Sequence, residues 1–144
     1  MRVLIGLALA CTMVVGSSNS SLSQEAKKEQ DFRTGQTMAE CAAFFRLAAQ
    51  LYASKPSLAE QANNKANGWE LAATLFILNG SSEEQQFHVK ETMQHIVDAK
   101  KTEYLARVES LGAKGFEDIS KEFNETCMPM VPLQEKVIEV MRRG

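Results

Sequence analysis

The chain has 144 residues, of which 44% are hydrophobic and 24% are charged, and its formal net charge is −2. This length suits a single domain, and the many apolar residues at low net charge exclude a chain that is disordered throughout. The near-neutral balance, with no basic stripe, argues against a nucleic-acid-binding protein. We therefore expect one folded domain and no nucleic-acid partner.

The first 23 residues have the composition of a secretory signal peptide. Arg2 supplies a positive charge, an apolar run from Val3 to Val15 follows it, and Gly16 and several serines come next. The run is too short to span a bilayer, and this order is typical of a cleaved signal. We expect cleavage between Gly16 and Gln24, a periplasmic or secreted protein, and no membrane association after cleavage.

Two other interpretations of this segment stay open. The apolar run would be a retained membrane anchor if it were not cleaved. Cys11 would be the lipidated residue of a lipoprotein signal, although Ala8 occupies the position where such signals usually carry a branched residue.

Helix signals dominate residues 37–144, after a flexible polar lead predicted over residues 24–36. A Ser or Thr followed three residues later by Glu is the capping box that begins many helices, and it occurs at Thr37, Ser57 and Ser81. Apolar residues then recur every three or four positions, which is the helical period. The expected helix ends are marked by Pro56, Asn79-Gly80, Gly112 and Pro129.

These signals predict an all-α, up-down-up-down four-helix bundle with a short C-terminal fifth helix packed across one end. The third helix is long, from Ser81 to Gly112. The fifth begins at Pro132, because proline is favoured in a first helical turn. The residues of the fifth helix that we expect to face inward are Leu133, Val137, Val140 and Met141.

Cys41 and Cys127 remain after the predicted cleavage. Cys41 lies near the start of the first helix of the bundle and Cys127 at the end of the fourth, and these two places meet at one end of an up-down-up-down bundle. An exported protein with an even number of cysteines is expected to pair them. We predict one disulfide, and two free buried thiols are the alternative.

Two patterns resemble metal sites. His88, Glu91, His95 and Asp98 fall on one stripe of the third helix, with spacings that suit zinc or iron. That stripe faces away from the apolar stripe, so we interpret it as a solvated surface. The soft sulfur atoms of residues 127–130 suit copper, but a disulfide beside two core methionines is the simpler interpretation. We predict no metal and no cofactor.

The function class is argued mainly from missing chemistry. The sequence has no nucleophile-and-base motif, no phosphate loop and no zinc-protease motif, so we expect a protein that is not an enzyme. A disulfide-linked helical scaffold is expected to act through its surface, with an unknown protein partner in the cell envelope or outside the cell. Phe44 is the candidate contact residue, and its packing under the fifth helix is the alternative.

A carrier of a small apolar ligand is the second hypothesis. The segment from Leu71 to Leu78 is apolar on nearly all sides, which predicts deep burial of that end of the second helix. A pocket between helices is a common ligand site. The candidate pocket residues are Trp69, Leu71, Leu75 and Phe76.

Overall fold

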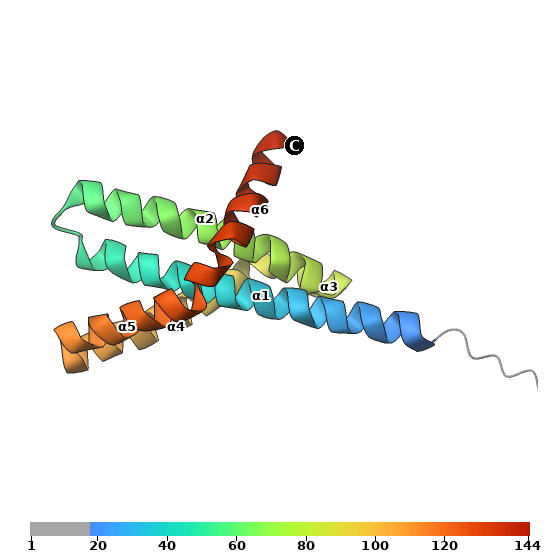
Figure 1. The fold of residues 1–144 in the computed structure, drawn as a ribbon, viewed down its shortest axis with the longest axis horizontal. Coiled ribbons are helices and arrows are strands. Elements are labelled where there is room, and N and C mark those ends of the chain that lie inside the picture. Colours follow the sequence, from blue (N-terminus) through green and yellow to red (C-terminus); the bar gives the residue numbers. More distant parts are fainter. Residues whose placement is uncertain (1–17) are drawn as a thin grey trace, which may run out of the picture.

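The computed structural model describes residues 18–144, which fold into helices connected by short turns (Figure 1). In chain order the elements are α1 (Ser18–Leu51), α2 (Pro56–Gly80), α3 (Glu83–Gln86), α4 (Val89–Leu111), α5 (Ala113–Thr126), the 3₁₀ turn η1 (Met128–Met130) and α6 (Val131–Arg143). The all-α prediction is confirmed. Residues 1–17, which hold Cys11 and most of the predicted signal peptide, lie outside the described residues. From residue 18 onward, no helix combines the length and the apolar character needed to span a membrane.

α1 and α2 form an antiparallel hairpin with a contact made of small residues. Gly35 faces Ile77, and a methyl group at Gly35 would lie 2.7 Å from the backbone nitrogen of Ile77. Gly80 approaches the backbone of Phe32 so closely that no side chain fits between them. The buried alanines of the two helices are Ala39, Ala42, Ala43, Ala48, Ala49, Ala62, Ala66, Ala72 and Ala73. These residues let the two helix backbones lie unusually close together.

α4 and α5 form a second hairpin, turned at Gly112. This residue has a φ of 60°, a backbone conformation that glycine adopts without steric cost. The predicted stop at Gly112 is confirmed. Between the two helices, Tyr104 and Lys100 of α4 contact Glu122 of α5.

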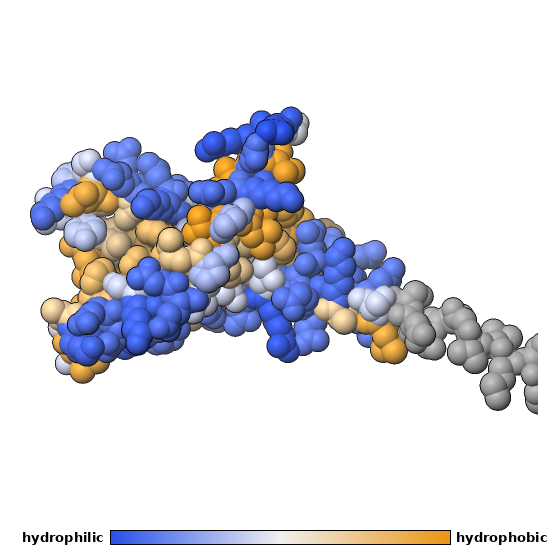
Figure 2. Space-filling view, viewed as in Figure 1, coloured by the Kyte–Doolittle hydropathy of each residue, from blue (hydrophilic) through white to orange (hydrophobic). Residues whose placement is uncertain are grey.

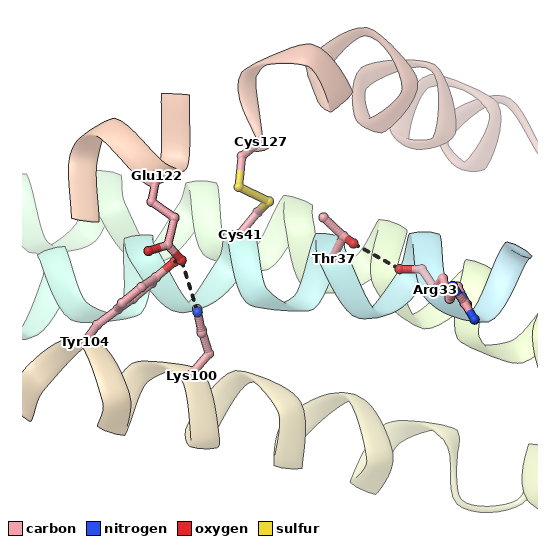
Figure 3. The surroundings of a disulfide bond; sticks show 7 residues. All are labelled: Arg33, Thr37, Cys41, Lys100, Tyr104, Glu122 and Cys127. Carbon is pink, nitrogen blue, oxygen red and sulfur yellow. Dashed lines mark hydrogen bonds and ion pairs between the residues drawn. A yellow bond between two sulfur atoms is a disulfide. The ribbon is translucent and has the colours of Figure 1, made fainter. Parts of the chain in front are cut away.

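The Cys41–Cys127 disulfide joins the two hairpins (Figure 3). The two cysteines are 86 positions apart in sequence, their Cα atoms are 5.8 Å apart, and both side chains are buried. Cys41 lies in the middle of α1, and Cys127 follows the last residue of α5. The predicted pairing is confirmed.

The order of the helices follows the up-down prediction within each hairpin, because α2 runs back along α1 and α5 runs back along α4 (Figure 1). α1 also packs against α4 and, less extensively, against α5. The two hairpins diverge toward the ends that carry the α1–α2 and α4–α5 turns. Residues of α1, α2, α5 and α6 line a groove between the hairpins.

The first helix begins earlier than the sequence predicts. α1 already includes residues 24–36, for which the sequence predicts a flexible lead, and Thr37 lies in the helix interior. The Thr37 hydroxyl donates to the carbonyl oxygen of Arg33 at 3.0 Å, so it caps no free N–H group. The helix extends toward its N-terminus because Phe32 and Gly35 pack against the end of α2.

The other two predicted capping boxes also differ from the structure. α2 begins at Pro56 without a side-chain cap, so Ser57 lies inside the helix. The third capping box is shifted by one residue, with the Ser82 hydroxyl and the Gln85 side chain each accepting from the other's backbone N–H. The predicted long third helix is interrupted at Phe87 and His88, giving the short α3 and the longer α4.

α6 packs against α2 and then projects from the body of the molecule (Figure 1). Pro132 lies in its first turn, as predicted. Val137 is buried, but Leu133, Val140 and Met141 are exposed, so the expectation that all four face inward is wrong for these three. The reason is that α6 contacts α2 along one narrow strip, near Gly68, and crosses beyond it.

Candidate binding groove

The opening between the hairpins contains two adjoining hollows that share Phe44, Phe45 and Lys65. The larger has a volume of about 490 Å³ and the smaller about 230 Å³. We call the two together the Phe44–Phe45 groove. The larger hollow is also lined by Trp69, Ser120, Phe123, Asn124, Met128, Val131, Gln134 and Glu135. The smaller is also lined by Ala48, Tyr52, Leu58, Gln61, Ala62 and Phe116. Figure 2 shows apolar surface between the two arms of the molecule, with hydrophilic surface on either side.

The floor of the groove consists of two consecutive phenylalanines of α1. Phe44 stacks on Phe123 of α5 with ring centroids 4.4 Å apart, and it meets the edge of Phe45 at 5.4 Å. Phe116 also stacks on Phe44, with ring centroids 6.1 Å apart. These are the favourable ring geometries for aromatic pairs. Phe44 and Phe45 are both half-buried, so the floor is held from below and open to the groove above.

A positive charge lies where the two hollows of the groove meet. Lys65 of α2 lines both hollows, and its Nζ lies 5.5 Å from the centroid of the Phe45 ring. Among residues 18–144, no carboxylate lies within ion-pair distance of Lys65. Glu135 of α6 lines only the larger hollow. A ligand in the groove therefore meets a cation at its middle and a carboxylate at its α6 end.

The disulfide positions one wall of the groove. Cys41 precedes the floor residue Phe44 by one helical turn, and Cys127 precedes Met128 and Val131 of the wall. The bond therefore fixes where η1 and α6 leave the body relative to the aromatic floor. Gly68 supports this arrangement from α2, because its missing side chain admits Gln134 and Ile138 of α6.

Two polar clusters brace the helices around the groove. Arg46, next to the floor, donates to both carboxylate oxygens of Glu70 at 2.7 and 2.8 Å and to Asn63 and Asn67. The hydrogen bond to Glu70 outweighs the opposing effect of burial and raises the pKa of Arg46. This cluster ties α1 to α2.

The second cluster centres on Glu122, between α4 and α5 (Figure 3). Its carboxylate accepts hydrogen bonds from Tyr104 at 3.0 Å and Arg107 at 2.7 Å, and pairs with Lys100 at 3.0 Å. Burial by itself would raise the pKa of Glu122, but the hydrogen bonds from Arg107, Lys100 and Tyr104 outweigh it, and the pKa is lowered. Burial, with Glu122 close by, raises the pKa of Tyr104. The cluster is a structural link within the second hairpin.

The structure separates the four candidate pocket residues. Trp69 is buried and lines the larger hollow. Leu75 and Phe76 are half-buried against the core, whereas Leu71 is exposed on the outer surface of α2. Leu78 is exposed as well, so the predicted deep burial of this end of α2 is wrong at both ends of the segment. The physical reason is that α2 packs mainly against α1, and Leu71 and Leu78 lie on the exposed side of α2.

Phe44, the candidate surface residue, lies on the floor of the groove, and Val131, Gln134 and Glu135 of α6 line the same hollow. The apolar period of three or four residues places its neighbours there, Phe45, Phe116 and Phe123, on the apolar stripes of α1 and α5. Periodicity correctly turned these rings toward the centre of the molecule. It carried no information on how far α5 stands from α2, and that separation is what leaves the rings accessible.

The stripe of possible metal ligands on the third predicted helix faces outward. His88, Glu91, His95 and Asp98 are all exposed, and their interpretation as a solvated surface is consistent with this placement. In residues 18–144 no three potential metal ligands of the histidine, cysteine or acidic type converge on one point. Beside the disulfide, Met128 lines the groove and is half exposed.

The groove offers shape and apolar surface more than reactive chemistry. Of the residues that line it, none is a histidine or a cysteine, and the hydroxyl of Ser120 donates to the carbonyl oxygen of Phe116. Comparison of the chain with protein-family models, with curated proteins and with solved structures finds no match.

Proposed function

We propose that this protein is an exported binding protein whose Phe44–Phe45 groove holds an apolar segment of another polypeptide. The observation that carries this proposal is the aromatic floor, in which Phe44 and Phe45 are supported by α5 yet uncovered toward the groove. Accessible aromatic residues with apolar surroundings and a polar rim are the usual centre of a protein interface.

The disulfide and the predicted signal peptide support export. A disulfide between buried cysteines is expected to persist in an oxidising compartment, in agreement with the signal peptide predicted over residues 1–23. A site of this kind in the periplasm or outside the cell would meet partners of the cell envelope or secreted proteins. The lack of a nucleophile-and-base pair along the groove favours binding over catalysis.

A carrier of a small apolar ligand is the second candidate. The larger hollow, at about 490 Å³, falls within the range of small-molecule sites. Such sites enclose most of their ligand, whereas this groove lies open between two helix arms and continues into a second hollow. An elongated open groove suits the side of a helix better than a small molecule.

Site-specific photo-crosslinking tests the proposal. A photoreactive residue replaces Gln61, which is exposed on the groove rim, in the protein produced in its source cells. The matched control is Gln94 on α4, which is also an exposed glutamine with one hydrogen bond to a residue four positions away. We expect a discrete protein adduct from position 61 only, and its loss when Met128→Glu places a charge in the groove.

Equal adducts from positions 61 and 94, or no protein adduct from position 61, would overturn the proposal. An adduct with a lipid or another small molecule at position 61 would favour the carrier. Circular dichroism of each variant verifies that the helices are intact.

A further inference from the structure

We propose that the occupant of the Phe44–Phe45 groove is an amphipathic helix of a partner protein, with two apolar anchors and an acidic residue between them. This inference rests on the proposed function and specifies the partner's chemistry. It comes from the length of the groove, from its division into two hollows and from the position of Lys65.

The length of the groove matches a short helix. Along α2 its lining runs from Leu58 to Trp69, which at 1.5 Å per residue is about 16 Å, or about three helical turns. Two of its walls, α2 and α5, are helices, so a partner helix is expected to lie between them with its apolar side on the phenylalanine floor. This is the helix-in-groove mode of recognition, with anchors spaced by whole turns.

The two hollows set the spacing of the anchors. One lies toward Leu58 and Tyr52 and the other toward Trp69 and Met128. On α2, Ala62 lines only the smaller hollow and Trp69 only the larger one, and these two residues are seven positions, or about two turns, apart. A partner helix reaches this spacing with side chains at positions i and i+7. Large apolar residues at these positions would each enter one hollow.

Lys65 supplies the charge that selects the partner. It lies at the junction of the hollows, above the Phe45 ring, and has no carboxylate partner among the described residues. A partner helix resting on the floor would cover this ammonium group and remove part of its water. An Asp or Glu at i+3 or i+4 of that helix would face Lys65 between the two anchors.

Glu135 favours one orientation of the partner along the groove. It lines the larger hollow but not the smaller one, so a basic residue of the partner belongs near the α6 end and an acidic one is disfavoured there. A fatty acid carries its charge at one end of a single chain, and this does not match a cation placed between two hollows. The arrangement therefore favours a peptide helix over a free apolar acid.

Selection from a library of helical peptides tests the inference. The mature disulfide-bonded protein is immobilised, and peptides are selected against the wild type, Lys65→Glu and the control Lys90→Glu, which changes an exposed lysine on α4. We expect wild type and Lys90→Glu to enrich peptides with two apolar residues seven apart and an acidic residue between them. Lys65→Glu is expected to enrich a basic residue at that place.

The affinity of an enriched peptide is then measured from the emission of Trp69, which is the only tryptophan of the chain and lines the groove. Exchange of the acidic residue for Gln should weaken binding about fivefold to wild type and much less to Lys65→Gln, as expected for an ion pair worth about 1 kcal/mol. A long-chain fatty acid is titrated in parallel.

Four results would overturn the inference. These are peptides enriched without an acidic residue, a motif unchanged by Lys65→Glu, no enrichment at all, and saturable binding of the fatty acid without peptide binding. If the photoreactive residue at position 61 still gives protein adducts in such a case, the groove remains a binding site and only the inferred chemistry of the partner is wrong. If Gln61 gives none, the proposed function itself fails.

Discussion

Glu122 accepts hydrogen bonds from Tyr104 and Arg107 and pairs with Lys100, so one carboxylate holds three side chains of the second hairpin in place. The spacing of the sequence did not predict this cluster, because Glu122 and Lys100 are polar residues on two different helices and each fits a solvent-facing position. Only the tight turn at Gly112 brings them together.

The lowered pKa of Glu122 makes its contribution to stability pH-dependent. Because the pKa is lower in the folded than in the unfolded chain, the unfolded chain binds more protons between the two values, and stability rises with pH there. The contribution is complete above the ordinary glutamate pKa of about 4.3, and it is lost as the pH falls through the lower folded value. Denaturant melts should show Glu122→Gln less stable than wild type at neutral pH. The gap between their free energies of unfolding should become smaller in acid. A gap that is constant down to pH ~2 would contradict this account.

The two cysteines are expected to behave as one unit. Cys41→Ser or Cys127→Ser opens the same loop of 86 residues, and the loop-entropy model gives a loss of about 4–5 kcal/mol in the free energy of unfolding. Helical circular dichroism should persist at low denaturant. The double variant should lose about as much as either single variant in denaturant melts, whereas simple addition of the two losses would mean that the cysteines act separately.

At the scale of the helices, local sequence signals identified the elements better than their ends. The apolar period predicted a helix within each of α1, α2, α4, α5 and α6, and Gly112 and Pro132 marked a turn and a first helical turn. The predicted helix start at Thr37 was wrong, because a capping box shows only that a helix beginning there would have its free backbone N–H groups satisfied. Whether the helix continues toward its N-terminus depends on Phe32 and Gly35 meeting the distant end of α2.

The glycines where helices touch lead to a prediction about stability. Gly35→Ala should destabilise the protein by about 1–3 kcal/mol, because the new methyl group meets the backbone of Ile77 in a close-packed contact. Alanine's better helix propensity, worth about 1 kcal/mol, only partly offsets this. The control is Gly68→Ala, where the methyl group meets the flexible ends of Gln134 and Ile138 and the change in stability should be small. Equal effects of the two substitutions on the denaturation midpoint would show that close approach of α1 and α2 is not the cause.

On the scale of the whole molecule, the arrangement of the hairpins creates the candidate site. Small residues draw α2 close to α1, while larger aromatic rings separate α1 from α5. One disulfide then holds the end of α5 and the start of α6 beside the phenylalanine floor. The sequence predicted the disulfide and the helical class. It did not predict the groove, because crossing angles depend on how side chains from distant segments pack together.

We propose above that the protein binds its partner in the Phe44–Phe45 groove. Fluorine NMR tests it directly, with fluorinated phenylalanine at all seven phenylalanine positions of the chain. The partner segment captured at Gln61, or a peptide selected from the library, is titrated into the labelled protein. We expect the groove signals to shift, namely those of Phe44, Phe45, Phe116 and Phe123. The signals of Phe76 and of the exposed Phe87 should stay in place. Shifts confined to these two control residues, or no shift at saturation, would contradict the account.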